Sequence, residues 1–272
     1  MTKRRLLLVG IDGLRVADAL GGVDAPTLQA LVSAGSSVPL VMEVPTISGP
    51  GWTSLLTGTT HAEHGVFDNS FVGHRIAPQS DLLSAVRVQQ PSATTFAASG
   101  WPPLTDPDGP GPVIDPRRDD QHAGVHRSVV RDGETYGYRR ADAEITAVAV
   151  HVLRDAVPDA SFVYLGETDE AAHLYGAISD EYRYALARVD AHLAQLVSTI
   201  RSRTTDRDEE WILAVTTDHG HLDEGGHGGS EDIVRSSFLA AVTVVSGDFH
   251  PIPLPEVVGP HQVAPLLIRE LL

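Results

Sequence analysis

The sequence predicts an α/β protein with a mostly parallel central sheet and helices on both faces. Short apolar runs rich in β-branched residues, typical of buried parallel strands, recur along the chain. Between most of them lie longer segments with the spacing of amphipathic helices. Strands that alternate with helices form a parallel sheet covered on both sides. At 272 residues the chain fits one domain, residues 1–272.

The predicted strands are short runs of β-branched, aromatic and leucine residues. The first run, LLLVGI, stops at an Asp-Gly pair, and a later run, WILAV, is soon followed by Asp-His-Gly-His. Such continuous apolar runs indicate strands that are buried on both faces. In chain order the predicted strands are Leu6–Ile11, Val38–Val44, Thr94–Ala98, Ser161–Leu165, Trp211–Val215 and Ser237–Val245.

The predicted helices lie between these strands. Pro26 suits the first turn of a helix, and Leu186, Val189 and Leu193 fall on one stripe of a long helix. In chain order the predicted helices are Ala25–Val32, Trp52–Leu56, Leu82–Val86, Ala141–Ala156, Tyr182–Ile200 and His261–Leu272.

Residues 71–134 differ in texture from the rest of the chain. They offer at most one short helix, Leu82–Val86, and one short strand, Thr94–Ala98. The stretch Pro102–Arg118 is crowded with Pro, Asp and Gly, which is typical of a loop. We therefore expect residues 71–134 to form a small irregular insertion that acts as a cap over the core.

Composition limits the partners and the location. The 36 acidic and 20 basic residues give a net charge of −16, which argues against a nucleic-acid polymer or an anionic membrane as partner. The chain has no cysteine, which excludes disulfides, thiolate catalysis and Cys-based zinc sites. The first apolar run is too short for a signal peptide, and no run has membrane-spanning length. We therefore expect a cytoplasmic protein and leave its oligomeric state open.

Polar side chains that packing in a hydrophobic core does not explain directly follow several of the predicted strands. Asp12 follows the first strand, Asp169 and His173 follow the fourth, and Asp218-His219 follow the fifth. In open α/β sheets, ligands collect beyond the carboxyl ends of the strands. Imidazole together with carboxylate favours Zn²⁺, Mn²⁺ or Fe²⁺ over Mg²⁺ or Ca²⁺.

Two further residues complete a mechanism. His227 follows Asp218-His219 on a glycine-rich loop, and Ser48 follows the second strand. Three Asp and three His supply two ions with three protein ligands each. Two ions about 4 Å apart can hold both the attacking and the leaving oxygen of a phosphoryl displacement. Metal coordination also favours the alkoxide of a serine, which is otherwise a poor nucleophile.

Each residue also has a simpler interpretation. Asp12 is compatible with an ordinary strand-to-turn junction, and Asp169 with His173 is compatible with a solvated pair on a helix face. Ser48 is a possible N-cap of the helix that begins near Trp52. Four coincident strand ends are hard to explain in this way, so the metal site is favoured.

The ordered motifs resemble those of the alkaline phosphatase superfamily, and most closely those of type I phosphodiesterases and nucleotide pyrophosphatases. The resemblance implies an alkaline-phosphatase-like fold and covers nearly the whole chain except the insertion. The motifs are Gly10-Ile11-Asp12-Gly13-Leu14-Arg15, Pro45-Thr46-Ile47-Ser48-Gly49-Pro50, His64-Gly65-Val66-Phe67-Asp68-Asn69, Thr168-Asp169 through His173-Leu174-Tyr175-Gly176, and Thr217-Asp218-His219-Gly220.

The resemblance implies a role for each site residue. Ser48, at a position where the family usually has threonine, would be the nucleophile and form a phosphoseryl enzyme that water hydrolyses. Asn69 would stabilise the non-bridging oxygens of the phosphate. One ion would be held by the set Asp12, Ser48, Asp218 and His219. The second ion would be held by the set Asp169, His173 and His227. For both ions the ligand types favour Zn²⁺ first and Mn²⁺ second.

The departures from related families narrow the function. The motif around Ser48 also resembles the sulfatase signature. Sulfatases need an arginine two residues after the proline that corresponds to Pro50, and here Trp52 occupies that position. The chain also lacks a long insertion before His227 that nucleotide pyrophosphatases carry, which puts nucleotide specificity in doubt. His221 looks as eligible as its neighbours and yet has no place in the two-ion scheme.

The sequence therefore predicts a two-metal hydrolase of small phosphate esters, with phosphodiesters or pyrophosphates as the first choice of substrate. No Lys or Arg flanks Ser48 to neutralise a dianionic monoester, and Arg15 is the nearest cation within the motifs. A phosphomonoesterase and a phosphoryl transferase or mutase remain alternatives. A sulfatase and a catalytically silent metal-binding module are further from the pattern.

Overall fold

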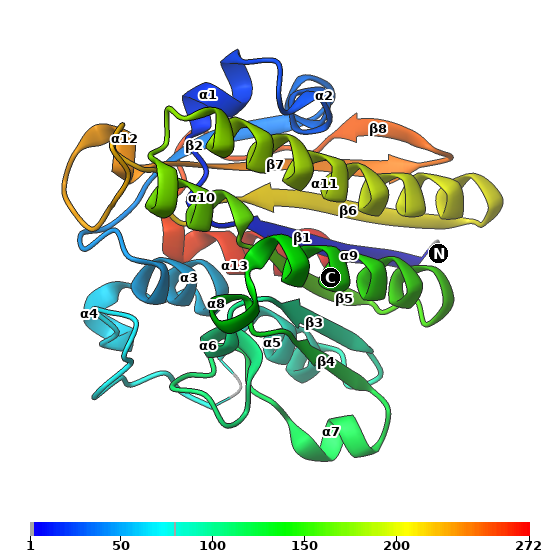
Figure 1. The fold of residues 1–272 in the computed structure, drawn as a ribbon. Helices are drawn as coiled ribbons and strands as arrows, with labels where there is room; N and C mark the ends of the chain where they lie inside the picture. The colour runs from blue at the N-terminus through cyan, green and yellow to red at the C-terminus, as the bar shows by residue number, and fades with distance from the viewer. Residues whose placement is uncertain (1–2, 79) are drawn as a thin grey trace.

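The computed structural model describes residues 3–78 and 80–272 and has the predicted α/β architecture. Its described residues contain one eight-stranded sheet with the order β2-β7-β6-β1-β5-β3-β4, and β8 pairs with the last part of β7, beyond the residues that pair with β2 (Figure 1). The strands are β1 (Lys3–Ile11), β2 (Ser36–Val41), β3 (Thr95–Ser99), β4 (His126–Val130), β5 (Ala160–Leu165), β6 (Glu209–Thr216), β7 (Ser236–Val245) and β8 (Asp248–Pro251).

Helices cover both faces of this sheet. The longer ones are α2 (Pro26–Ala34), α3 (Ser48–Thr57), α5 (Leu82–Gln89), α9 (Tyr138–Asp155), α10 (Glu167–Tyr175), α11 (Asp180–Asp206) and α13 (Val263–Leu271). The short ones are α1 (Val16–Gly21), α4 (His61–His64), α6 (Pro102–Thr105), α7 (Arg118–His122), α8 (Gly133–Tyr136), α12 (Asp232–Arg235) and the 3-10 helix η1 (Pro260–Gln262). Helices α2, α9 and α11 pack on one face, and α3, α5 and α13 pack on the other (Figure 1).

The central strand shows why both faces are buried. Leu6 and Leu8 of β1 belong to the core under α13, whereas Leu7, Val9 and Ile11 belong to the core under α11. Alternate side chains of a strand point to opposite faces, so a continuous apolar run fits a strand covered on both sides. The prediction from the run LLLVGI is confirmed.

The direction of the strands matters for the site. Strands β3, β4, β5, β1 and β6 are parallel neighbours. β7 is antiparallel to β6, and β2 is antiparallel to β7, so β2 runs in the same direction as β6. The carboxyl ends of β1, β2, β5 and β6 therefore lie along one edge of the sheet.

The expectation of at most one helix and one strand in residues 71–134 is wrong. This segment contains α5, α6, α7, the start of α8 and two strands, of which β3 pairs with β5 and β4 is the edge strand of the sheet. It thus contributes to the central sheet, and a capping role for its remaining part stays a prediction. None of the helices in the described part of the chain has both the length and the apolar character needed to cross a bilayer.

Candidate metal centre

The four predicted strand ends meet at one edge of the sheet. Asp12 directly follows β1, and Asp218 follows β6 after one residue. Asp169 lies in the first turn of α10, immediately after β5. Ser48 is the first residue of α3, which follows β2. The sheet topology brings these distant segments together, as expected for a ligand site beyond the carboxyl ends of parallel strands.

One group of donor atoms surrounds the Nε2 atom of His219. Asp12 Oδ1 lies 3.4 Å from it, Asp218 Oδ2 lies 3.3 Å away, and Ser48 Oγ lies 3.2 Å away. Ligand bonds of about 2.0–2.1 Å in a tetrahedral site place neighbouring donor atoms about 3.3–3.4 Å apart. The three distances from His219 Nε2 are therefore those expected between ligands of one small divalent ion, and all four residues are buried.

In each carboxylate of this group, one oxygen accepts hydrogen bonds from the protein and the other does not. Asp12 Oδ2 accepts hydrogen bonds from Trp52 Nε1 at 2.9 Å and from the Tyr164 hydroxyl at 2.7 Å. Asp218 Oδ1 accepts one from the Gly13 backbone N–H at 3.4 Å. The other oxygens, Asp12 Oδ1 and Asp218 Oδ2, have no hydrogen-bond partner among the described residues. Buried carboxylate oxygens without a partner are costly, and a bound cation satisfies both.

The ionisation behaviour of the group agrees with this. Burial, with the charge of Asp169 as the next contribution, raises the pKa of Asp12 to about 6. Burial, followed by the charges of Asp12 and Asp169, raises the pKa of Asp218 well above its ordinary value. Burial lowers the pKa of His219, which keeps its imidazole neutral. The protein alone thus disfavours the carboxylate charges, and a divalent ion offsets that penalty.

The second group lies beside the first. His173 Nε2 lies 3.0 Å from His227 Nε2, and Asp169 Oδ1 lies 3.5 Å from the former and 3.8 Å from the latter. His227 Nδ1 lies 2.7 Å from the Thr46 carbonyl oxygen and donates to it, so Nε2 keeps its lone pair for a metal. The rings of His219 and His227 stack with centroids 3.8 Å apart, so the two groups adjoin closely enough for a two-ion centre.

Two local devices fix this second group. Asp142 on α9 accepts hydrogen bonds from the backbone N–H groups of Gly166 and Glu167. These bonds fix the start of α10, whose first turn carries Asp169. Gly225 has φ +92°, and a Cβ at this position would lie 2.3 Å from a backbone oxygen of α10. Only glycine allows the loop that carries His227 to pass so close to that helix.

The nucleophile candidate and its proposed helper are held together by the backbone. Ser48 lies inside α3, whose N-cap is Ile47, so the N-cap interpretation of Ser48 is wrong. The Gly49 N–H donates to Asn69 Oδ1 at 2.8 Å. This contact orients the Asn69 amide with its Nδ2 as the end that can donate to a ligand near Ser48.

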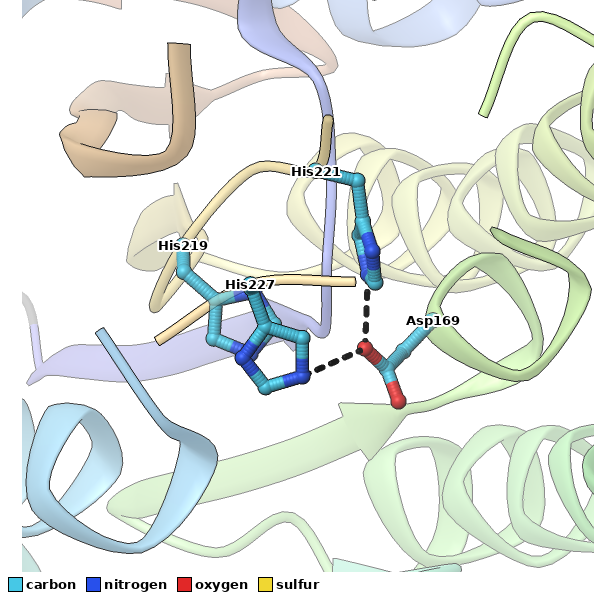
Figure 2. Close-up of side chains that lie close together, drawn as sticks. All are labelled: Asp169, His219, His221 and His227. Carbon is cyan, nitrogen blue, oxygen red and sulfur yellow. Dashed lines mark hydrogen bonds and ion pairs between the residues drawn. The ribbon is translucent and has the colours of Figure 1, made fainter. Parts of the chain in front are cut away.

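The structure brings together every residue of the predicted site, and it adds four that the sequence interpretation did not assign. These are Trp52 and Tyr164, which bind Asp12, Thr46, which binds His227, and His221, whose Nε2 lies 2.8 Å from Asp169 Oδ1 (Figure 2). One donor atom from each of Asp169, His219, His221 and His227 lies within 4.8 Å of the other three.

Removing the Tyr164 hydroxyl tests how the first group is positioned. Tyr164→Phe keeps the buried ring and removes one of the two donors to Asp12 Oδ2. Partners that orient metal ligands typically change metal affinity by about 10–100-fold, so we expect Zn²⁺ affinity to fall by about tenfold. Competition with a chromophoric chelator measures this.

Tyr138→Phe is the matched control, because the ring of Tyr138 lies 6.3 Å from that of Tyr164 and is also buried. Within the described part of the chain, its side chain makes no hydrogen bond to the first group, and its backbone N–H donates to Glu170. Equal Zn²⁺ affinities in both variants would show that the Tyr164 hydroxyl does not orient Asp12.

Comparison with known proteins agrees with this geometry. Residues 6–237 match the family model "Type I phosphodiesterase / nucleotide pyrophosphatase". An uncharacterized pyrophosphatase/phosphodiesterase of Schizosaccharomyces pombe is 22% identical over 79% of the chain and 44% of its own length. Human ectonucleotide pyrophosphatase/phosphodiesterase family member 1 is 25% identical over 79% of the chain and 23% of its own length. The chain thus spans less than half the length of these two relatives.

A solved structure shares the whole fold. The inactive variant of murine ectonucleotide pyrophosphatase/phosphodiesterase 5 in complex with AMP superposes with a TM-score of 0.62, 15% identity and coverage of 99% of this chain and 95% of that one. The family match extends over most of the chain and includes all four strand ends of the metal centre. The chain therefore belongs to the type I phosphodiesterase/nucleotide pyrophosphatase family.

Proposed function

We propose that the protein is a two-metal hydrolase of small phosphodiesters or pyrophosphates. The observation that carries the proposal is the placement of the Ser48 hydroxyl 3.2 Å from His219 Nε2, beside the partnerless oxygens of Asp12 and Asp218. Family membership supports hydrolysis of this class of bond, and the murine relative binds AMP, a phosphate ester that cleavage of a nucleotide diester or pyrophosphate can release.

The proposed reaction assigns one role to each side chain. Ser48 Oγ loses its proton and bonds to phosphorus, while the bond from phosphorus to the leaving oxygen breaks and that oxygen takes up a proton. Water then cleaves the phosphoseryl ester and restores the Ser48 hydroxyl. Asn69 Nδ2 donates to a non-bridging oxygen as charge develops there. When bound, the two ions would supply positive charge that favours the serine alkoxide and offsets the charge of the phosphate.

The preference for a diester rests on the cations near the site. The Arg15 guanidinium, the nearest cation within the motifs, lies 2.8 Å from Asp18 and 2.7 Å from Asp223. With both carboxylates bound to it, this arginine adds little positive charge for a dianionic monoester. Asn69, a neutral donor, suits the single negative charge of a diester.

A substrate panel tests the proposal. Protein loaded with Zn²⁺ or Mn²⁺ is assayed with bis(4-nitrophenyl) phosphate, 4-nitrophenyl phosphate and a nucleoside diphosphate sugar. We expect the diester or the pyrophosphate to be hydrolysed with a kcat/KM at least tenfold above that of the monoester. A preference for the monoester would contradict the assignment. Product transferred to an added alcohol rather than water would favour the transferase alternative, and no turnover at all would favour a silent metal-binding module.

A further inference from the structure

His221 is the residue of the cluster that the two-ion scheme leaves without a role. Its side chain is fully buried, and Figure 2 shows its ring directed at the Asp169 carboxylate. The chain around it is fixed by two backbone hydrogen bonds, from Gly220 N–H to the Val234 carbonyl at 2.8 Å and from Leu222 N–H to the Gly226 carbonyl at 3.0 Å. A side chain held so firmly against a proposed metal ligand calls for a function.

The distances from Asp169 Oδ1 to the three nearby histidines separate two kinds of contact. The nitrogen atoms of His173 and His227 and the Oδ1 atom of Asp169 are 3.0, 3.5 and 3.8 Å apart. These values spread around the roughly 3.4 Å that separates two ligands of one tetrahedral ion. His221 Nε2 lies 2.8 Å from Asp169 Oδ1, which is a hydrogen-bond distance for N–H and oxygen.

The backbone closes one side of the His221–Asp169 contact. Gly13 has φ +63°, and a Cβ at this position would lie 2.6 Å from His221 Nε2 and 2.8 Å from Asp169 Oδ1. A residue other than glycine would therefore push these two atoms apart. Close packing of this kind fits a direct hydrogen bond, since it restricts the space around the two atoms.

We propose that His221 is a positioning residue for the second ion. Its Nε2–H donates to Asp169 Oδ1, which keeps one lone pair of that oxygen for the hydrogen bond and turns the other toward His173 and His227. The carboxylate is then oriented before an ion arrives. The inference rests on the proposed function in one respect, that Asp169 is taken as a metal ligand. Loss of such an orienting partner typically lowers metal affinity by about 10–100-fold.

The test measures metal binding rather than turnover. His221→Leu removes the donor and keeps an apolar filling, whereas His221→Gln keeps an N–H at nearly the same reach. His61→Leu is the matched control, because His61 is also buried and its ring nitrogens have no hydrogen-bond partner among the described residues. Each variant is made in the wild-type chain and in an Asp218→Asn background, where the first group is disabled and only the second can bind Co²⁺.

We expect His221→Leu to weaken Co²⁺ binding in the Asp218→Asn background by about 10–100-fold, and both His221→Gln and His61→Leu to stay close to their parent. The visible absorption spectrum of bound Co²⁺ should be the same with histidine or glutamine at this position, because no ligand is lost. Unchanged Co²⁺ affinity in His221→Leu would overturn the proposal. A changed spectrum in His221→Gln would overturn it as well, in favour of direct coordination by His221.

These readouts separate the inference from the proposed function. If the wild-type protein hydrolyses none of the esters while His221→Leu still weakens Co²⁺ binding, the proposed function fails and the positioning role stands. If the wild-type protein hydrolyses diesters and His221→Leu binds Co²⁺ as its parent does, the positioning role alone fails. Circular dichroism of the metal-free variants verifies that His221→Leu is folded; His221→Gln carries the spectroscopic test in either case.

Discussion

Ser48→Ala is expected to lower the turnover of bis(4-nitrophenyl) phosphate by about 10³-fold or more, since removal of a catalytic nucleophile has effects of this size or larger. The hydroxyl lies at the first turn of α3 and 3.2 Å from His219 Nε2. The methyl group of alanine fits the same space, so α3 and the carboxylates should remain in place. Two ions per chain should still bind, with weaker binding at the first group.

Ser48→Thr is the control for this prediction. It keeps a hydroxyl at the same position, and threonine is the residue the resemblance implies for most of the family, so activity within about tenfold of the wild type is expected. Rapid acid quenching of the wild-type reaction, followed by mass spectrometry of the peptide that contains Ser48, should reveal the phosphoserine. Full activity in Ser48→Ala, with its metal content intact, would exclude the covalent route.

The strands that are buried on both faces could be predicted from the sequence, whereas the partly exposed strands β4 and β8 could not. β5 is buried along its whole length, and β1 and β6 are buried over their last six residues, so the buried parts read as continuous apolar runs. β4 was missed because His126-Arg127-Ser128 open it and most of its residues are only partly buried at the edge of the sheet. β8 was missed because it has four residues, ends in Pro251 and pairs only with β7.

The clustering of the candidate metal ligands could be predicted for a geometric reason. Parallel neighbouring strands bring their carboxyl ends to one edge, so acids that follow separate apolar runs are expected to meet there. The residues that hydrogen-bond to those ligands could not be predicted in this way. Trp52 and Tyr164 bind the same oxygen of Asp12 from positions 40 and 152 residues away, and each is equally well explained as an ordinary aromatic core residue.

His221 shows the same limit within a single motif. His219 and His221 are two residues apart, and the pattern Asp-His-Gly-His does not say which imidazole faces which group. The local backbone decides this: Gly220 N–H binds the Val234 carbonyl, and His221 is turned toward Asp169. Such a direction depends on tertiary contacts that periodicity cannot reveal.

Asp218→Asn is expected to abolish metal binding at the first group and to lower diester turnover by about 10³-fold or more, because the group then lacks both a ligand and a charge. The same substitution should stabilise the metal-free protein. Asp218 is fully buried among other acids, and burial followed by the charges of Asp12 and Asp169 raises its pKa well above the ordinary value. Asparagine keeps the Oδ1 acceptor for the Gly13 N–H and removes the repulsion.

The pH dependence has a definite sign. A carboxyl group whose pKa is higher in the folded than in the unfolded state binds more protons when folded, so the stability of the metal-free wild type falls as pH rises through that interval. Burial raises the pKa of Asp218 well above the ordinary value of 3.8, so this carboxyl group destabilises the folded, metal-free protein increasingly as pH rises above that value. The gain from Asp218→Asn should therefore be larger at pH 7.5 than at pH 4.5.

Thermal unfolding of chelator-treated protein at both pH values measures this gain, which we expect to reach about 1–2 kcal/mol at pH 7.5, a rise of a few degrees in Tm. Asp190→Asn is the contrasting control: both of its oxygens accept backbone N–H bonds, from Thr27 and Leu28 at the start of α2. It should destabilise the protein, because an amide replaces one acceptor with a donor. If Asp218→Asn lowered the Tm as Asp190→Asn does, the carboxylates of the first group would not be held against their mutual repulsion, and the case for a cation between them would fail.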